Sequence, residues 1–132
     1  MKTFIISGRY YGDKCFPGLN DLLHEAERHP CAYNKMKKDF TMITVNAIRR
    51  HLKGYKAEGR VILHYTFGEP KKGKKRDYDN IQSAGRKIIN DALVKAGTIK
   101  DDSPDYLDWG SNAFVYTPGE PYILVEIEEI EG

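Results

Sequence analysis

The stretch RVILHYTF, residues 60–67, is rich in β-branched and aromatic residues and predicts a β-strand. Gly68 and Pro70 follow it and are expected to end the strand. Further along, residues 80–96 predict an amphipathic helix that ends at Gly97. Its apolar positions recur three and four residues apart at Ile81, Ala84, Ile88, Ala92 and Leu93. A buried strand followed by a one-sided helix indicates a sheet that is covered by helices.

Upstream, residues 33–52 predict a second long helix, and a short helix is expected to start near Asn20 and to stop at His29-Pro30. Three more strands are expected at residues 4–6, 113–117 and 122–130. Helices and strands mix without a strict βαβ alternation. We therefore predict an α+β fold with a mixed β-sheet and two main helices, in a single domain over residues 1–132.

The charge is divided unevenly along the chain. Residues 1–76 hold 17 Lys/Arg and 7 Asp/Glu, a net of +10, whereas residues 77–132 hold 4 and 12, a net of −8. This division fits a basic surface for a polyanion beside a separate acidic site, or an ordinary solvated surface once the chain has folded. The sequence has no long apolar run and no signal-peptide pattern, and its two cysteines form no disulfide framework. We expect a cytoplasmic protein with no membrane contact.

Aspartates flank the helix predicted at residues 80–96. Asp77 and Asp79 lie two residues apart, and in an extended segment both would point to the same side. Carboxylates are the ligands that Mg²⁺ prefers, so two or three aspartates can hold this ion. Asp101 and Asp102 follow the helix and would have to fold back to join them. Alternatively, Asp79 caps the helix with Gln82 as its partner, and the later pair belongs to a turn.

Three segments, RDYDN (residues 76–80), DALVKAG (residues 91–97) and KDDS (residues 100–103), together resemble the RusA-type Holliday junction resolvases. PGLN at residues 17–20 and NKMKK at residues 34–38 are similar to the phage and bacterial branch of that family. The resemblance implies a homodimer that binds four-way junction DNA and nicks two opposed strands with Mg²⁺ or Mn²⁺. By position it implies that Asp77, Asp79 and Asp102 are the catalytic, metal-binding aspartates.

The sequence departs from the family at its catalytic lysine. The family places this lysine four residues after the second aspartate, where this chain has Ser83. Counted back from the DAL segment, the position falls on Lys87, so the helix is about one turn longer than usual. We expect Lys87 to be the catalytic cation, with Arg86 as its competitor. Both could instead coat a solvated face of the helix.

Two basic segments are candidates for contacts with DNA phosphates. One is the loop that leads into the aspartates, with Lys71, Lys72, Lys74, Lys75 and Arg76, and the other is the helical segment with Lys35, Lys37 and Lys38. The aromatic residues Tyr106, Trp109 and Phe114 are expected to pack in the sheet or in a dimer interface. Two other functions stay open: a protein that binds branched DNA without cutting it, and a domain whose aspartates only cap helices and form turns.

Overall fold

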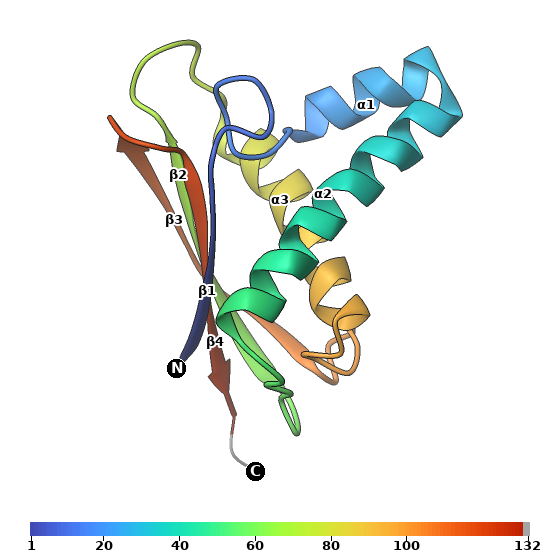
Figure 1. The fold of residues 1–132 in the computed structure, drawn as a ribbon, viewed down its shortest axis with the longest axis vertical. Coiled ribbons are helices and arrows are strands. Elements are labelled where there is room, and N and C mark those ends of the chain that lie inside the picture. The colour runs from blue at the N-terminus through green and yellow to red at the C-terminus, as the bar shows by residue number, and fades with distance from the viewer. Residues whose placement is uncertain (131–132) are drawn as a thin grey trace.

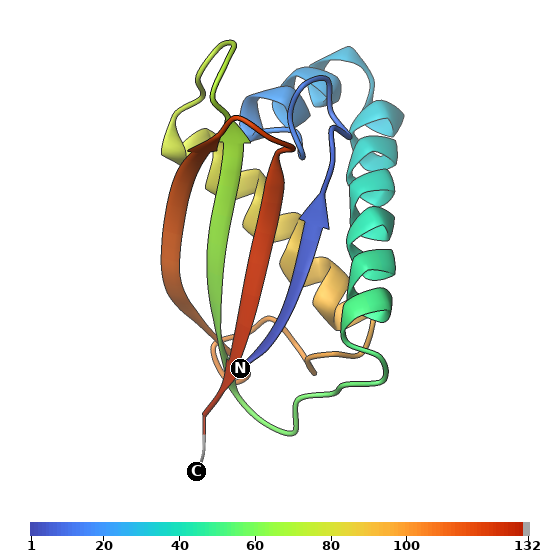
Figure 2. The same cartoon turned by 60° about the vertical axis from the view of Figure 1, so that its left-hand side comes forward.

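The computed structural model describes residues 1–130 and contains one four-stranded sheet with three helices on one of its faces (Figure 1). The strands lie in the order β1 (Lys2–Ser7), β4 (Tyr122–Glu129), β2 (Val61–Pro70) and β3 (Leu107–Thr117), as Figure 2 shows. β2 runs parallel to β3, whereas β4 is antiparallel to both β1 and β2. The predictions of an α+β fold and of a mixed sheet are confirmed.

The helices are α1 (Leu19–Arg28), α2 (Pro30–His51) and α3 (Tyr78–Lys95). His29 separates the first two, and its Nδ1 accepts a hydrogen bond from the backbone N–H of Cys31 at 3.1 Å. Pro30 occupies the first turn of α2, where a proline is tolerated because it removes an N–H that has no partner in the helix. α2 therefore starts three residues earlier than predicted. No helix among residues 1–130 is long and apolar enough to cross a membrane.

The core lies between the sheet and the helices. Alternate residues of β2 are buried, and they face the apolar stripe of α3, which includes Ile81, Ala84 and Ile88. The helix approaches the sheet closely at Gly85, where an added Cβ would lie 2.7 Å from Cε1 of Phe67. A glycine inside a helix lowers helix propensity, and here it makes room for the aromatic ring.

Three strands are longer than the sequence suggested, and β1 extends beyond the predicted residues 4–6 at both ends. β3 starts at Leu107 rather than at residue 113, because it pairs with β2 along its whole length through a polar segment. β2 continues to Pro70, so the expected stop at Gly68 is wrong. The ring of Tyr122 covers Gly68, where a Cβ would lie 2.3 Å from Cε1 of the tyrosine. That glycine makes room for a cross-strand aromatic ring.

α3 connects the parallel strands β2 and β3, and this connection determines where the aspartates lie. The loop of residues 71–77 precedes α3 at one end of the sheet, while residues 97–106 follow it at the opposite end (Figures 1 and 2). An α-helix rises about 1.5 Å per residue, so the two ends of α3 are roughly 25 Å apart. Asp77 thus lies at the start of α3, whereas the segment with Asp102 follows its other end and turns back along the helix, where Asp102 lines a pocket with Gln82 and Ser83.

Candidate functional site

Asp77 and Asp79 lie at the N-terminus of α3. Asp77 is the N-cap, and its Oδ1 accepts a hydrogen bond from the backbone N–H of Asn80 at 2.8 Å. Asp79 lies within the first turn, where its Oδ1 accepts from Nε2 of Gln82 at 3.1 Å. The expectation that both occupy an extended segment is therefore wrong, and the capping residue is Asp77 rather than Asp79. Both are exposed, and neither takes part in an ion pair within residues 1–130.

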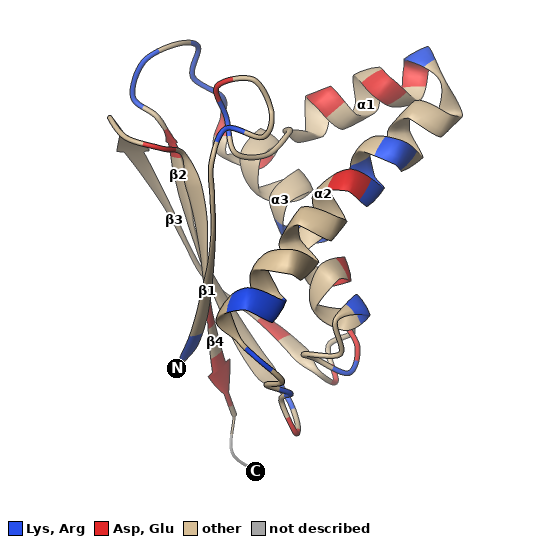
Figure 3. Cartoon of the chain, viewed as in Figure 1, with Lys and Arg blue, Asp and Glu red and all other residues tan. Residues whose placement is uncertain are grey.

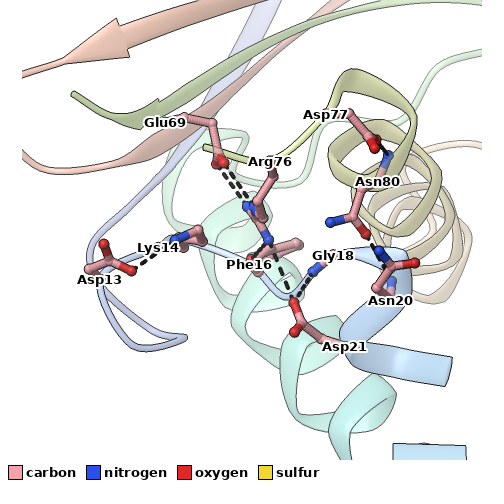
Figure 4. A network of polar contacts seen from close by, with 10 residues as sticks. All are labelled: Asp13, Lys14, Phe16, Gly18, Asn20, Asp21, Glu69, Arg76, Asp77 and Asn80. Carbon is pink, nitrogen blue, oxygen red and sulfur yellow. Dashed lines mark hydrogen bonds and ion pairs between the residues drawn. The ribbon is translucent and has the colours of Figure 1, made fainter. Parts of the chain in front are cut away.

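A buried ion pair fixes the residue before this pair of aspartates. The Arg76 guanidinium donates two hydrogen bonds to the Glu69 carboxylate, at 2.9 and 2.8 Å, and a third to the carbonyl oxygen of Phe16 at 3.0 Å (Figure 4). Only 10% of the arginine side chain is exposed. The predicted contact of Arg76 with DNA has no support from the structure, because the charge of Arg76 is already paired inside the protein. Arg76 instead attaches the start of α3 to the end of β2.

Asn80 ties the N-termini of two helices together. Its side-chain Oδ1 accepts a hydrogen bond from the backbone N–H of Asn20 in α1 at 2.8 Å (Figure 4). Gly18 lies so close that an added Cβ would be 2.6 Å from this Oδ1. Gly18 donates its own N–H to Asp21 Oδ2 at 2.8 Å. The PGLN and DYDN segments, which are far apart in the sequence, thus form one structural unit around the aspartates.

The loop before α3 presents free positive charge. The side chains of Lys71, Lys72 and Lys74 are exposed and form no hydrogen bond or ion pair within residues 1–130. Lys75 is exposed but has partners on its own loop and on β3: its Nζ donates to the carbonyl oxygens of Pro70, at 3.2 Å, and of Lys71, and lies 4.5 Å from the centre of the Tyr116 ring. Figure 3 shows the loop as a basic projection beyond the sheet. A pocket of about 440 Å³ at its base is lined by Lys74, Lys75 and Asp77.

The lysines of α2 are more fully paired. Lys35 forms an ion pair with Asp39 at 2.8 Å, and Lys37 forms one with Asp91 of α3 at 3.1 Å. Lys38 is exposed and has no such partner within residues 1–130. Of the two candidate DNA surfaces, the loop therefore offers more unpaired charge.

Asp102 and Lys87 lie together, apart from Asp77. Both line a second pocket, of about 410 Å³, between α3 and the start of β3, whereas Asp77 lines the first pocket. The Nζ of Lys87 is 3.4 Å from the carboxylate of Asp91, one turn further along the same helix. Gln82 links the two regions, because it lines the second pocket and hydrogen-bonds to Asp79.

The three aspartates do not form one metal site within a single chain. Among residues 1–130 there is no group of three His, Cys, Asp or Glu side chains placed to hold a metal ion. Asp77 and Asp79 are two exposed carboxylates at one helix N-terminus, and Mg²⁺ in proteins often takes only one or two carboxylates and fills its other positions with water and substrate phosphate. The third position, expected from Asp102, stays a prediction that would need a second chain.

Two residues of the second pocket, Arg86 and Trp109, have surroundings that the sequence did not predict. Arg86 is 8% exposed, and its guanidinium lies between the rings of Tyr65 and Trp109, 4.9 and 4.2 Å from their centres. Burial lowers the pKa of Arg86 from its usual value. Trp109 is 71% exposed, so it does not pack in the core of the sheet, and the alternative of a dimer interface stays a prediction. The one signal in the sequence was a lone tryptophan within the polar stretch DWGSN, residues 108–112.

No protein-family model matches this chain, and a search of curated proteins finds no match. The resemblance to the RusA-type resolvases therefore rests on the sequence motifs, and the functional argument rests on the geometry of the site.

Proposed function

We propose that this protein is a metal-dependent endonuclease that cuts four-way DNA junctions. One observation carries the proposal: two exposed aspartates that form no ion pair within residues 1–130 follow directly after a loop with three unpaired lysines. Such an arrangement suits a polyanion whose backbone must be held beside an acidic centre. A site for a small neutral ligand would not need this unpaired charge of both signs.

Different side chains have different roles in the proposed cleavage. Lys71, Lys72 and Lys74 bind backbone phosphates and so place one phosphodiester next to the aspartates. Asp77 and Asp79 would hold the metal ion through the carboxylate oxygens that α3 leaves free. A bound Mg²⁺ would polarise the phosphate and lower the pKa of a water molecule. Arg76 and Asn80 are positioning residues, since they fix the first turn of α3 on β2 and α1.

Paired nicks in a junction require two active sites, so the proposal includes a homodimer. Two features support a second chain. β3 is an edge strand, with exposed Val115 and Tyr116, and the helices leave the other face of the sheet uncovered (Figure 1). A second chain could also bring its Asp102 to Asp77 and Asp79, which the same chain does not do.

Cleavage of a synthetic four-way junction with one labelled strand at a time tests the proposal. With Mg²⁺ we expect nicks at symmetric positions in two opposed strands, and with EDTA none. Asp77→Asn and Asp79→Asn should lose cleavage but keep junction binding, because they remove metal ligands without removing basic residues. Asp105→Asn, a change at another exposed aspartate, is the matched control and should cut normally. Full cleavage by Asp77→Asn would refute the assignment.

Mixing variants tests whether the active site is shared between chains. If Asp102 acts across a dimer, a mixture of Asp77→Asn and Asp102→Asn chains contains heterodimers with one intact site, which nick one strand. If all ligands came from one chain, every site in the mixture would lack a ligand and cleavage would stay absent. Full cleavage by Asp102→Asn alone would remove this residue from the site.

The separation of Asp102 from Asp77 favours one alternative, a protein that binds branched DNA without cutting it. The same junction assay distinguishes the two functions. A complex that is retarded in a gel but stays intact with both Mg²⁺ and Mn²⁺ would establish the alternative.

A further inference from the structure

The second pocket holds a buried charge without an anionic partner. Arg86 is 8% exposed, and its Nε and Nη2 atoms are buried without a hydrogen-bond acceptor among residues 1–130. No carboxylate within these residues forms an ion pair with it. A buried guanidinium is costly unless its charge is compensated, and two aromatic rings compensate it only in part. An anion in the pocket would complete this environment.

Trp109 offers a second contact in the same pocket. One face of the indole covers the Arg86 guanidinium at 4.2 Å, yet 71% of the residue is exposed. Its uncovered surface is therefore open to a planar group. Nucleic-acid bases stack on such aromatic side chains in proteins that bind single strands.

We infer that this pocket, between α3 and the start of β3, binds one nucleotide of a DNA strand, its phosphate on Arg86 and its base on Trp109. The inference rests on the proposed function, since it takes DNA as the polyanion. Among the residues that line the pocket, Lys87 adds positive charge, whereas the carboxylate of Asp102 would repel a phosphate. The pocket has room for this group at about 410 Å³.

The position of the pocket relates this nucleotide to the acidic residues. Gln82 lines the pocket and donates a hydrogen bond to Asp79 at 3.1 Å. A nucleotide bound in this pocket would therefore lie near the phosphodiester that Asp77 and Asp79 would cut. Inside a duplex both faces of a base are covered by its neighbours, so Trp109 can stack only on a base that is exposed, as at a branch point or a strand end. The pocket thus recognises departure from regular duplex structure.

The chain contains one tryptophan, so its fluorescence reports on this pocket directly. Titration in EDTA with an oligothymidylate of about eight nucleotides should quench the fluorescence of Trp109 to saturation. A blunt duplex of the same length should quench it several-fold less. Absence of quenching by the single strand, or equal quenching by the duplex, would overturn the inference.

Two variants separate a binding role from a structural one. Arg86→Met keeps the apolar stem and should bind the oligonucleotide about tenfold more weakly, whereas Lys95→Ala, an exposed cation elsewhere on α3, should bind as the unaltered protein does. Trp109→Ala changes an exposed residue, so its folding should be retained; anisotropy of a labelled oligonucleotide should show a similar loss. Unchanged binding by Trp109→Ala would contradict the assignment.

Self-association is the competing use of this surface. If Trp109 fluorescence changes with protein concentration alone, and the oligonucleotide does not compete, the surface binds a second chain and the nucleotide assignment fails. The two proposals fail separately. Quenching without nicking in Mg²⁺ would refute the nuclease and keep the nucleotide site. Normal nicking by Trp109→Ala with unchanged binding would refute the nucleotide site and keep the nuclease.

Discussion

Replacing Lys71, Lys72 and Lys74 together with alanine tests which surface of the protein binds DNA under the proposed function. These three side chains are exposed and unpaired within residues 1–130, so each can neutralise one phosphate. Each lost phosphate contact lowers the slope of log K against log salt by about 0.9, so the triple variant should lose about 2.7 from the slope. When the salt concentration rises from about 50 to about 200 mM, the affinity of the unaltered protein for DNA should therefore fall about 40-fold more than that of the variant.

The assay is fluorescence anisotropy of a labelled four-way junction in EDTA, at several salt concentrations. Lys35, Lys37 and Lys38 changed together to alanine form the matched control, because this variant removes the same charge from the other candidate surface. Two of these lysines already pair with carboxylates of the protein, so the slope should fall by about 1 or less. A larger fall for the α2 variant than for the loop variant would refute the reasoning.

Three further predictions concern the fold around the site. Arg76→Met or Glu69→Gln should each lower the free energy of unfolding, measured by urea denaturation, by about 3 kcal/mol, because each leaves a buried charge or donor unpaired. The double variant should lose less than the sum of the two single losses. Gly85→Ala should cost about 1 kcal/mol or more in the same measurement, since its Cβ would meet the Phe67 ring at 2.7 Å; equal stability would contradict this. Burial raises the pKa of the Cys15 thiol to about 12, whereas Cys31 is exposed. Thiol titration at pH 8 should therefore find one fast cysteine, and stability should fall as pH rises above about 9, where only the unfolded thiol ionises.

The periodicity of the sequence was sufficient to predict the helices and most of the sheet. Apolar residues at helical spacing located α3 to within two residues, and the alternation in residues 123–128 located β4. β3 was half missed because its first residues, LDWGSN, are polar and pair with β2 only in three dimensions. Strand pairing is a long-range property, and a polar edge strand shows little of it in its own residues.

The candidate site was predicted less completely than the fold. The aspartates and the basic loop stand out in the sequence because their charges cluster. The burial of Arg76 could not be predicted, since its partner Glu69 is the one acidic residue of β2 and lies beyond the point where that strand was predicted to end. The sequence showed that a helix stands between Asp77 and Asp102, but not how far the chain turns back after it, because that depends on the direction in which the chain leaves the helix.

The contact between Gly18 and Asn80 links two short segments that lie 60 positions apart in the chain. A side chain at residue 18 would displace the Asn80 amide, which binds the backbone of Asn20, so mutations in the two segments should show genetic interaction. A selection for restored activity after damage at Asn80 should return compensating changes around Gly18 and Asn20. Engineered hybrids of this protein would need to inherit both segments from the same parent.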